Sequence, residues 1–477
     1  MKLIGEEDER PKIIMIPYPA QGHVTPMLNL ASTFAVRGFR PILVIPEFIR
    51  RRISAAASEA IFLESLPDGL DEVNGNSTID FFSIEKAMET HMPAHFESFL
   101  TAELRRSNSG GGGGGGGEVV CVVVDLLASW AIRVTRGCGV QAVGFWPAMF
   151  ASYRLIAAIP EMISRRIVSD TGNPIHKGPI CLQHGEPIIS TEELPWLIGN
   201  STSRASRFKF WIRTLERSRT LHCILINSFL DEERTSNDII ISQTKYHPMI
   251  ISPQEFNHPI IFPVGNIIPK HVPTSGKVSL WEEDRSCLDW LDKQSPSSVV
   301  YISFGSWVNP IGTTQIKTLA LALEASRRPF VWSLRHTWRE GLPKGYTTRV
   351  SKQGIVVSWV PQIELLGHKS VGCYLTHCGW NSILEAIQCQ KPLLCYPIAG
   401  DQFVNCAYVV DAWKIGSRLG GFQQRDVEEG LRQAMDEGDM RKIIARLNER
   451  VMGKHSSLQV NANLTSFVDS LSKCVYK

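Results

Sequence analysis

The segment from Trp359 to Gln402 reads WVPQIELLGHKSVGCYLTHCGWNSILEAIQCQKPLLCYPIAGDQ, and it determines the fold that we expect. The apolar run Val371–Thr376 is typical of a buried strand, and the apolar periodicity after Gly379 is typical of a helix. Strand, glycine-containing turn and helix follow one another in the order of a βα unit. The helix would begin at the carboxyl end of the strand, where its free N–H groups and positive dipole end can hold a diphosphate.

Polar side chains gather at the turn between this strand and this helix. His377 stands at the tip of the strand, and Asn381 and Ser382 open the helix. Imidazole, amide and hydroxyl groups are donors that suit phosphate oxygens. The pattern leaves one alternative open, which is an ordinary βα unit of an α/β domain with no ligand at its edge.

Strand-like and helix-like patterns alternate along the rest of the chain, which favours an α/β fold with parallel sheets covered by helices. Pro26 suits the first position of a helix that ends at Gly38. The predicted strands are Lys12–Ile16, Arg40–Ile45, Val119–Val124, Val299–Phe304, Phe330–Leu334, Ile355–Trp359, Val371–Thr376 and Pro392–Tyr396. The other predicted helices are Leu126–Arg136, Thr313–Ser326, Asp426–Met435, Met440–Met452 and Asn463–Leu471.

A chain of 477 residues exceeds the size of one hydrophobic core, so we expect two domains. Periodicity fails between about residues 246 and 273, where Pro, His and Asn accumulate. We therefore predict an N-terminal domain over residues 1–256 and a C-terminal domain over residues 257–455. The run of glycines from Gly110 to Gly117 cannot pack, and it predicts a surface loop.

Composition excludes several classes of protein. Hydrophobic residues make up 43% of the chain and charged residues 20%, which are globular values. A net charge of +3 gives no reason to expect nucleic acid or an anionic membrane as a partner. No apolar run is long enough to span a membrane, and the acidic, polar N-terminus is unlike a secretory signal. We expect a cytoplasmic protein without integral membrane association, whose eleven cysteines are reduced.

Two polar side chains follow predicted strands in the first half of the chain. His23 lies between the first strand and its helix, and Asp125 ends the strand Val119–Val124. Ligands of open α/β sheets lie at the carboxyl ends of the strands, so these residues are candidates for one site. An imidazole can act as a base near neutral pH when a carboxylate holds its other nitrogen. The alternative for His23 is a loop residue bonded to nearby backbone.

The segment Trp359–Gln402 resembles the C-terminal signature box of plant family-1 UDP-sugar glycosyltransferases. The Trp, the Pro-Gln pair, the run His-Cys-Gly-Trp-Asn-Ser, the Glu and the final Asp-Gln all stand at the family's spacing. The Gly-His-x-x-Pro loop around His23 and the strand that ends in Asp125 match further motifs of the family. The resemblance implies two facing Rossmann-like domains in the GT-B architecture with a deep cleft between them. It also implies that residues 456–477 form a helix that packs back on the N-terminal domain.

The resemblance implies an enzyme that transfers a sugar from a UDP-sugar to a small acceptor with inversion. His23 would be the base and Asp125 would orient it. The donor-binding residues would be Ser306, Trp359, Val360, Gln362, His377, Trp380, Asn381, Ser382, Glu385, Asp401 and Gln402. The chain contains no Asp-x-Asp motif, so we expect no metal ion and no other cofactor. The oligomeric state stays open, with a monomer favoured.

The sugar and the acceptor are less closely defined. In this family a final Gln goes with glucose, so Gln402 favours UDP-glucose, and UDP-galactose, UDP-xylose and UDP-glucuronate remain open. A catalytically silent UDP-sugar-binding protein is a further alternative. Trp146, Phe150 and Tyr153 are candidates for an acceptor cleft that takes lipophilic plant metabolites, although helical spacing is equally typical of core aromatics.

Overall fold

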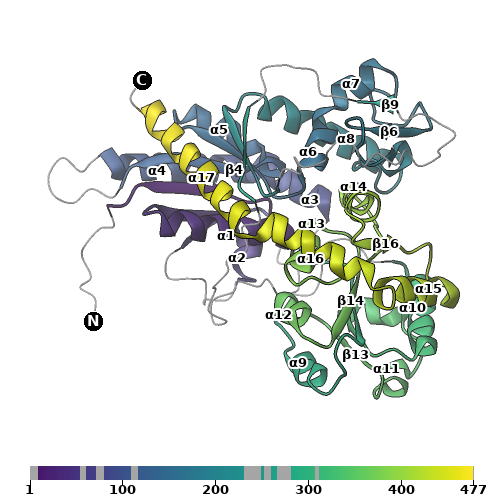
Figure 1. Cartoon of the computed structure of the whole chain (residues 1–477). Helices are drawn as coiled ribbons and strands as arrows, with labels where there is room; N and C mark the ends of the chain where they lie inside the picture. The colour runs from purple at the N-terminus through teal and green to yellow at the C-terminus, as the bar shows by residue number, and fades with distance from the viewer. Residues whose placement is uncertain are drawn as a thin grey trace, which may run out of the picture.

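Two parallel sheets, each covered by helices, form two domains (Figure 1). The computed structural model describes residues 9–53, 61–70, 80–108, 117–229, 249–251, 259–265, 281–306 and 311–475. Most of the glycine tract lies outside these residues. In the described part of the chain, no helix is both long and apolar enough to cross a membrane. The predicted α/β class with two Rossmann-like domains is confirmed.

The first domain contains a seven-stranded sheet with the strand order β10-β8-β5-β4-β1-β2-β3, in which every pairing is parallel. Apart from Lys12 and Asp125 at their ends, its central strands β1 and β4 are apolar and almost fully buried, because helices cover both faces of the sheet. The strands are β1 (Lys12–Ile16), β2 (Arg40–Pro46), β3 (Phe62–Leu66), β4 (Val119–Asp125), β5 (Ala142–Trp146), β8 (Cys223–Ile226) and β10 (Ile260–Pro263). A small separate sheet joins β6 (Pro179–Cys181), β7 (Ile189–Ser190) and β9 (Met249–Ile250).

The second domain contains a six-stranded parallel sheet with the order β13-β12-β11-β14-β15-β16. Its strands are β11 (Val299–Ser303), β12 (Phe330–Ser333), β13 (Gly354–Val357), β14 (Val371–Thr376), β15 (Leu393–Cys395) and β16 (Gly416–Arg418). Its α-helices are α9 (Ser286–Leu291), α10 (Thr313–Ser326), α11 (Tyr346–Arg349), α12 (Gln362–Gly367), α13 (Trp380–Gln388), α14 (Gln402–Ala407), α15 (Gln424–Met435) and α16 (Asp439–Met452).

The helices of the first domain lie between its strands in the chain and pack on the sheet. They are α1 (Gln21–Val36), α2 (Glu47–Arg50), α3 (Phe81–Lys86), α4 (Met92–Asn108), α5 (Trp130–Gly137), α6 (Phe150–Ala157), α7 (Ile159–Ser164) and α8 (Ser201–Ser218). The structure also contains short helices of other types. Three are 3₁₀ helices, at Leu126–Ala128, Thr191–Glu193 and His336–Gly341, and two are π-helices, at Ala87–His91 and Tyr408–Ala412.

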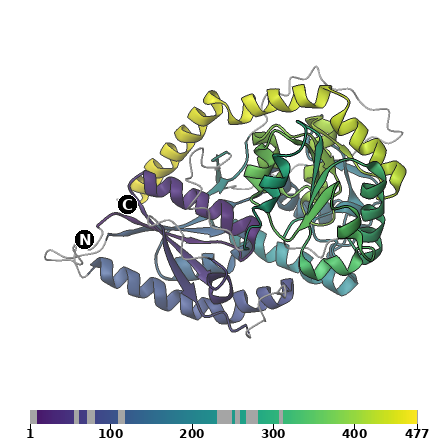
Figure 2. The same ribbon diagram turned by 90° about the horizontal axis from the view of Figure 1, so that it is seen from below.

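Helix α17 (Lys454–Val475) joins the two domains, and Figures 1 and 2 show it running from the second domain onto the first. Phe467 is buried between Phe34 of α1 and Phe262 of β10, at ring-centroid distances of 6.0 and 5.9 Å. The Asn463 side chain donates to the carbonyl of Pro263 at 2.6 Å. The C-terminal segment therefore lies against the N-terminal sheet.

Each sheet has one point where the chain order reverses. In the first sheet this point lies between β1 and β4, where Ile16 is in register with Val124. In the second sheet it lies between β11 and β14, where Ser303 is in register with Thr376. Open α/β sheets bind ligands at such points, beyond the carboxyl ends of the strands. The fold thus provides two candidate half-sites.

Several predicted elements have other bounds in the structure, and three of these differences concern the site or the domain boundary. Helix α1 begins at Gln21, so Pro26 lies inside it instead of at its start. A proline cannot bond the carbonyl four residues earlier, and Asn381 Nδ2 of the second domain donates to that Gly22 carbonyl at 2.9 Å instead. The first sheet also extends past residue 256, because β10 pairs in parallel with β8.

Trp359 is the third difference, since it lies beyond the end of β13. Residues 358–361 form a loop from the strand to α12. Ser358 is polar and Pro361 lacks a backbone N–H group, and neither suits a buried strand. The strand β13 therefore ends at Val357.

Candidate active site

His23 and Asp125 meet at the switch point of the first domain. His23 lies in the first turn of α1, and Asp125 is the last residue of β4. His23 Nδ1 is 2.8 Å from Asp125 Oδ2, and the two side chains are 21% and 0% exposed. The other carboxylate oxygen accepts from the backbone N–H of Leu127 at 2.9 Å, which fixes the carboxylate. The imidazole therefore has one nitrogen held by a buried carboxylate and keeps Nε2 for another group.

His377 lies at the switch point of the second domain, directly after β14. Its ring lies between Gly305 and Gly379, and a Cβ added to either glycine would come within 2.5 Å of Nε2. Gly305 has φ +82, a second reason for glycine at that position. Burial lowers the pKa of His377 to about 4, so the ring is neutral at physiological pH. A neutral imidazole can donate one hydrogen bond to a phosphate without adding charge.

Helix α13 begins next to this ring, and its N-terminus is not capped by a side chain. The N-cap residue is Gly379, so the N–H groups of Trp380, Asn381 and Ser382 have no partner within the helix. These N–H groups and the positive end of the helix dipole form an anion site at the edge of the sheet. Ser306 lies across the same cavity, after β11.

A hydrogen-bond network holds the polar side chains behind α13. Gln362 Nε2 donates to Glu385 Oε2 at 2.7 Å and to Ser382 Oγ at 3.2 Å. Gln362 Oε1 accepts from the hydroxyl of Tyr301 at 2.7 Å and from that of Tyr374 at 3.3 Å. The two tyrosine rings stack at 4.6 Å on neighbouring strands. The sequence singled out Gln362, Ser382 and Glu385 but not the two tyrosines, because their strand positions look like core.

Trp359 and Val360 lie on the other side of the same cavity. Val360 is buried, whereas Trp359 is partly exposed and presents an aromatic surface. Its ring lies 6.2 Å from that of Trp281. A partly exposed indole at the edge of an anion site suits a flat base, because aromatic rings stack with offset faces.

The remaining predicted donor residues already make contacts inside the protein. Trp380 Nε1 donates to the carbonyl of Asn227 in the first domain at 2.7 Å, so only the backbone N–H of Trp380 is left for a sugar. Gln402 Oε1 accepts from the N–H groups of Ile398 and Ala399, which leaves its Nε2 as a donor. Asp401 accepts from Asn405 at 2.9 Å. Burial raises the pKa of Asp401, while Asn405 and the nearby His23 oppose the rise.

One cavity of about 630 Å³ brings both half-sites together. This volume is within the range of small-molecule sites. Asp125 lies directly behind His23 and does not line the cavity, whereas the other predicted catalytic and donor residues do: His23, Ser306, Trp359, Val360, Gln362, His377, Trp380, Asn381, Ser382, Glu385, Asp401 and Gln402.

The first-domain wall of the cavity is largely apolar, and it differs from the predicted acceptor set. Trp146 lines the cavity, but Phe150 and Tyr153 do not. These two rings stack on each other at 6.2 Å and pack against the core, since helical spacing serves packing as well as binding. The lining residues that the sequence analysis did not single out include Phe81, Leu127, Ser152, Ile156, Arg207, Phe210 and Trp211. They come from several elements, so no local pattern marks them.

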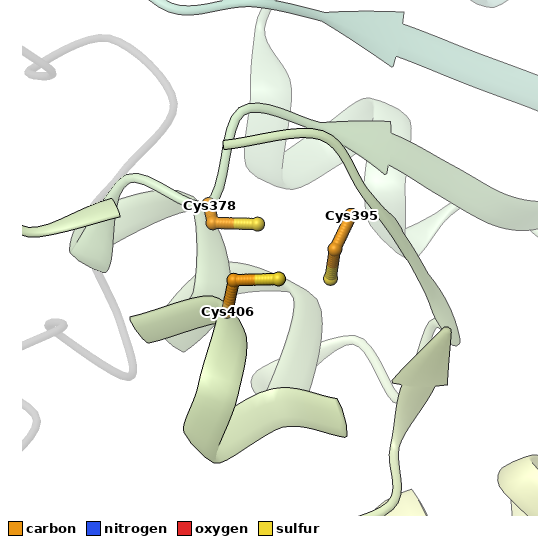
Figure 3. Close-up of side chains that lie close together, drawn as sticks. All are labelled: Cys378, Cys395 and Cys406. Atoms are coloured by element: carbon orange, nitrogen blue, oxygen red, sulfur yellow. The ribbon is translucent and has the colours of Figure 1, made fainter. Parts of the chain in front are cut away.

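The described residues contain one cluster of three potential metal ligands, formed by Cys378, Cys395 and Cys406. Their sulfur atoms lie within 4.8 Å of one another and point toward a common centre (Figure 3). All three side chains are buried, and none of them lines the cavity. A metal ion held there could not contact a diphosphate in the cavity, so this cluster belongs to the core beneath α13.

Comparison with known proteins agrees with this geometry. Residues 249–451 match the family model described as "UDP-glucoronosyl and UDP-glucosyl transferase". The chain is 49% identical to UDP-glycosyltransferase 82A1 of Arabidopsis thaliana, over 97% of this chain and 99% of that protein. It is 31% identical to linamarin synthase 1 of Manihot esculenta, over 86% of this chain and 85% of that protein.

Solved structures share the fold. Os79 from O. sativa in complex with UDP superposes with a TM-score of 0.77 at 24% identity, over 96% of this chain and 100% of that one. A UDP-glucose: anthocyanidin 3-O-glucosyltransferase in complex with UDP gives a TM-score of 0.74 at 22% identity, over 98% and 100% of the two chains. The architecture is therefore GT-B. With two half-sites that meet in one cavity and relatives that match along the whole chain, the protein belongs to the plant family of UDP-glycosyltransferases.

Proposed function

We propose that this enzyme transfers glucose from UDP-glucose to a hydroxyl group of a small lipophilic molecule with inversion, giving a β-glucoside and UDP. The observation that carries the proposal is the position of the two half-sites on opposite walls of one cavity. A base on one wall and an anion site on the other are the arrangement that direct displacement at the anomeric carbon requires. The apolar first-domain wall, with Trp146, Phe210 and Trp211, supports a lipophilic acceptor.

In the proposed mechanism His23 acts as the base. The acceptor hydroxyl is too weak an acid to ionise alone, and a positioned base typically contributes roughly 10²–10⁴-fold to the rate. Because Asp125 accepts from Nδ1–H, the lone pair of the ring lies on Nε2, which takes the proton of the acceptor. The acceptor oxygen attacks the anomeric carbon from the face opposite UDP, and Asp125 stabilises the imidazolium that forms.

The leaving diphosphate would be held by α13. Negative charge grows on the diphosphate as the glycosidic bond breaks, and the N–H groups at Trp380 and Asn381 are already directed toward it. The neutral His377 adds a donor, and Ser306 and Ser382 add hydroxyl groups. These donors carry out the task that a divalent ion performs in other sugar-nucleotide transferases, so we propose that catalysis needs no metal.

The uracil, the ribose and the sugar of the donor would be bound by other residues of the same cavity. Trp359 would stack on uracil, and the backbone of Val360 would bond its edge. Glu385, held by Gln362 at 2.7 Å, would accept from the ribose hydroxyls. Asp401, Gln402 Nε2 and the backbone N–H of Trp380 would bond the sugar, and Gln402 is the residue that favours glucose.

The test compares donors one at a time. The purified enzyme is incubated with UDP-glucose, UDP-galactose, UDP-xylose or UDP-glucuronate, with a limiting panel of phenolic and terpenoid alcohols and with EDTA. We expect the highest turnover with UDP-glucose, no loss with EDTA and an anomeric proton coupling typical of a β-glucoside. A higher turnover with another donor would overturn the choice of sugar. UDP binding without product from any donor would show a silent UDP-sugar-binding protein instead.

A further inference from the structure

Arg207 of helix α8 places a guanidinium group in the apolar wall of the cavity. The residue lines the cavity near Phe81, and its guanidinium carbon lies 4.2 Å from the centre of that ring. The Phe82 ring lies 5.2 Å from the same carbon. Arginine is always charged in proteins and carries five N–H donors in a rigid fork. A charged fork is unexpected in a part of the wall that contains the aromatic side chains of Phe81, Phe210 and Trp211.

Among the described residues, no acceptor takes a hydrogen bond from Arg207. Its Nε atom is buried and has no partner in this part of the chain. Within the described residues, no carboxylate forms an ion pair with it. Glu85 lies within electrostatic range of Arg207, but its carboxylate bonds Arg213. Asp80 instead caps helix α3, where it accepts from the Ser83 hydroxyl at 2.5 Å and from the backbone of residues 82 and 83.

The surroundings of Arg207 connect it to the catalytic end of the cavity. Tyr18 is buried, lies within electrostatic range of Arg207, and has its ring 5.1 Å from that of His23. Burial lowers the pKa of Arg207, and Tyr18, Glu85 and Asp80 oppose this change. Partial burial of a guanidinium group without an anionic partner costs free energy, which a carboxylate bound in the cavity would recover.

We propose that Arg207 forms a carboxylate subsite, so that the preferred acceptor is a hydroxylated carboxylic acid. The carboxylate would pair with the guanidinium fork in the bidentate geometry that arginine favours, and the hydroxyl would reach His23. This inference rests on the proposed function, and it narrows the lipophilic acceptor to one that carries an anionic group away from the reacting oxygen. The acid itself is not glucosylated, so the product is a glucoside that resists alkaline hydrolysis.

The test measures acceptor binding and turnover separately. The probes are 4-hydroxybenzoic acid, 4-hydroxycinnamic acid and 16-hydroxyhexadecanoic acid, each compared with its methyl ester at pH 7.5, because they vary the separation of hydroxyl and carboxylate. Binding to the UDP-loaded enzyme is measured by calorimetry. For at least one pair we expect the acid to bind roughly 10- to 100-fold more tightly than the ester, as for hydrogen bonds to a charged group.

Variants on one helix separate charge recognition from folding. Arg207→Met should reduce the acid-to-ester preference to about threefold or less while ester binding is kept, and Arg207→Lys should retain part of the preference. Lys209→Met is the matched control, because Lys209 is exposed two residues further along α8. Equal binding of acid and ester in every pair, or an unchanged preference in Arg207→Met, would overturn the subsite. Glucoside formation from the methyl esters reports on the proposed function independently, since those probes carry no charge.

Discussion

The two switch points of this molecule have the same backbone architecture and opposite chemistry. Each places a histidine beyond the carboxyl end of a central parallel strand, with His23 in the first turn of α1 and His377 directly after β14. His23 keeps 21% of its side chain exposed and has a buried carboxylate as a partner. His377 is held between two glycines, and burial lowers its pKa to about 4. In the proposed mechanism the surroundings, and not the residue type, decide whether an imidazole exchanges protons or serves as a neutral donor.

The difference also suits the division of labour in the proposed mechanism. There the first half-site needs a proton acceptor that can become charged, and Asp125 would stabilise that charge. The second would receive an anion, which a fixed set of neutral donors would bind without a change of protonation. Asn381 Nδ2, which donates to the Gly22 carbonyl, connects the two half-sites directly.

Among the tests of this comparison between the two half-sites, removal of His23 has the largest expected effect. His23→Ala should lower kcat by roughly 10²–10⁴-fold, because the acceptor proton then has no positioned base. The UDP affinity should change little, since the anion site lies in the other domain. Product formation by chromatography and UDP binding by calorimetry measure the two effects. A variant that loses UDP binding but keeps kcat would reverse the assignment of the half-sites.

Asp125→Asn should give the next largest loss, roughly 10²-fold in kcat, at the low end of the range for general-base catalysis. The amide oxygen can still accept from Leu127, so the NH₂ group faces His23 Nδ1 and moves the ring proton to Nε2, where the base is needed. The double variant with His23→Ala should be no slower than His23→Ala alone, because the two residues act as one unit. Losses that multiply would contradict this coupling.

Gly379→Ala changes the second half-site and leaves the first untouched. The backbone there is ordinary for alanine, with φ −63, but the new Cβ would lie 2.5 Å from His377 Nε2 and would displace the ring. Loss of one hydrogen bond to a charged phosphate predicts a UDP affinity roughly 10-fold lower or more, measured by calorimetry. Gly438→Ala is the control, since no atom lies within 4 Å of its added Cβ. Equal affinities of the two variants would remove His377 from the phosphate site.

The fold was accessible from the sequence where a single pattern dominates. Thr313–Ser326 and Val371–Thr376 begin and end where periodicity predicts, because both are buried along one face or on both faces. The start of α1 was mispredicted at Pro26, because a partner from the other domain satisfies the carbonyl that the proline leaves unbonded. A rule based on local sequence cannot predict such a contact between domains.

The residues of the site also fall into those that the sequence alone could identify and those that it could not. Residues that end a strand or lie in the connection after it, such as Asp125 and His23, could be selected because the carboxyl edge of a parallel sheet gathers them. Tyr301 and Arg207 could not be selected, since a tyrosine in an apolar strand and an arginine in a polar helix look like ordinary positions. Phe150 is the opposite case, because the sequence selects it for the acceptor cleft but it does not line the cavity. Its helical spacing fits a binding wall and a core equally well.

The smallest expected effect concerns stability, and it separates the two histidines by pH. The folded-state pKa of His377 is about 4, whereas an unfolded histidine has a pKa near 6.5. Between these values the unfolded chain binds a proton that the folded chain excludes, so the free energy of unfolding falls as pH drops from 6.5 toward 4. The full shift corresponds to about 3 kcal/mol, and partial exposure of the ring reduces this to roughly 1–3 kcal/mol.

His377→Asn removes this proton uptake and leaves the other titrating groups in place. We therefore expect the free energy of unfolding of the variant, measured by urea denaturation without UDP, to fall less steeply between pH 6.5 and 4 than that of the unmodified enzyme. The comparison cancels contributions from buried carboxyls such as Asp401, whose raised pKa acts in the opposite direction. If the free energies of unfolding of the two proteins showed the same dependence on pH, water would have to reach the His377 ring. His377 would then act at the second switch point as a protonated cation and not as a neutral donor.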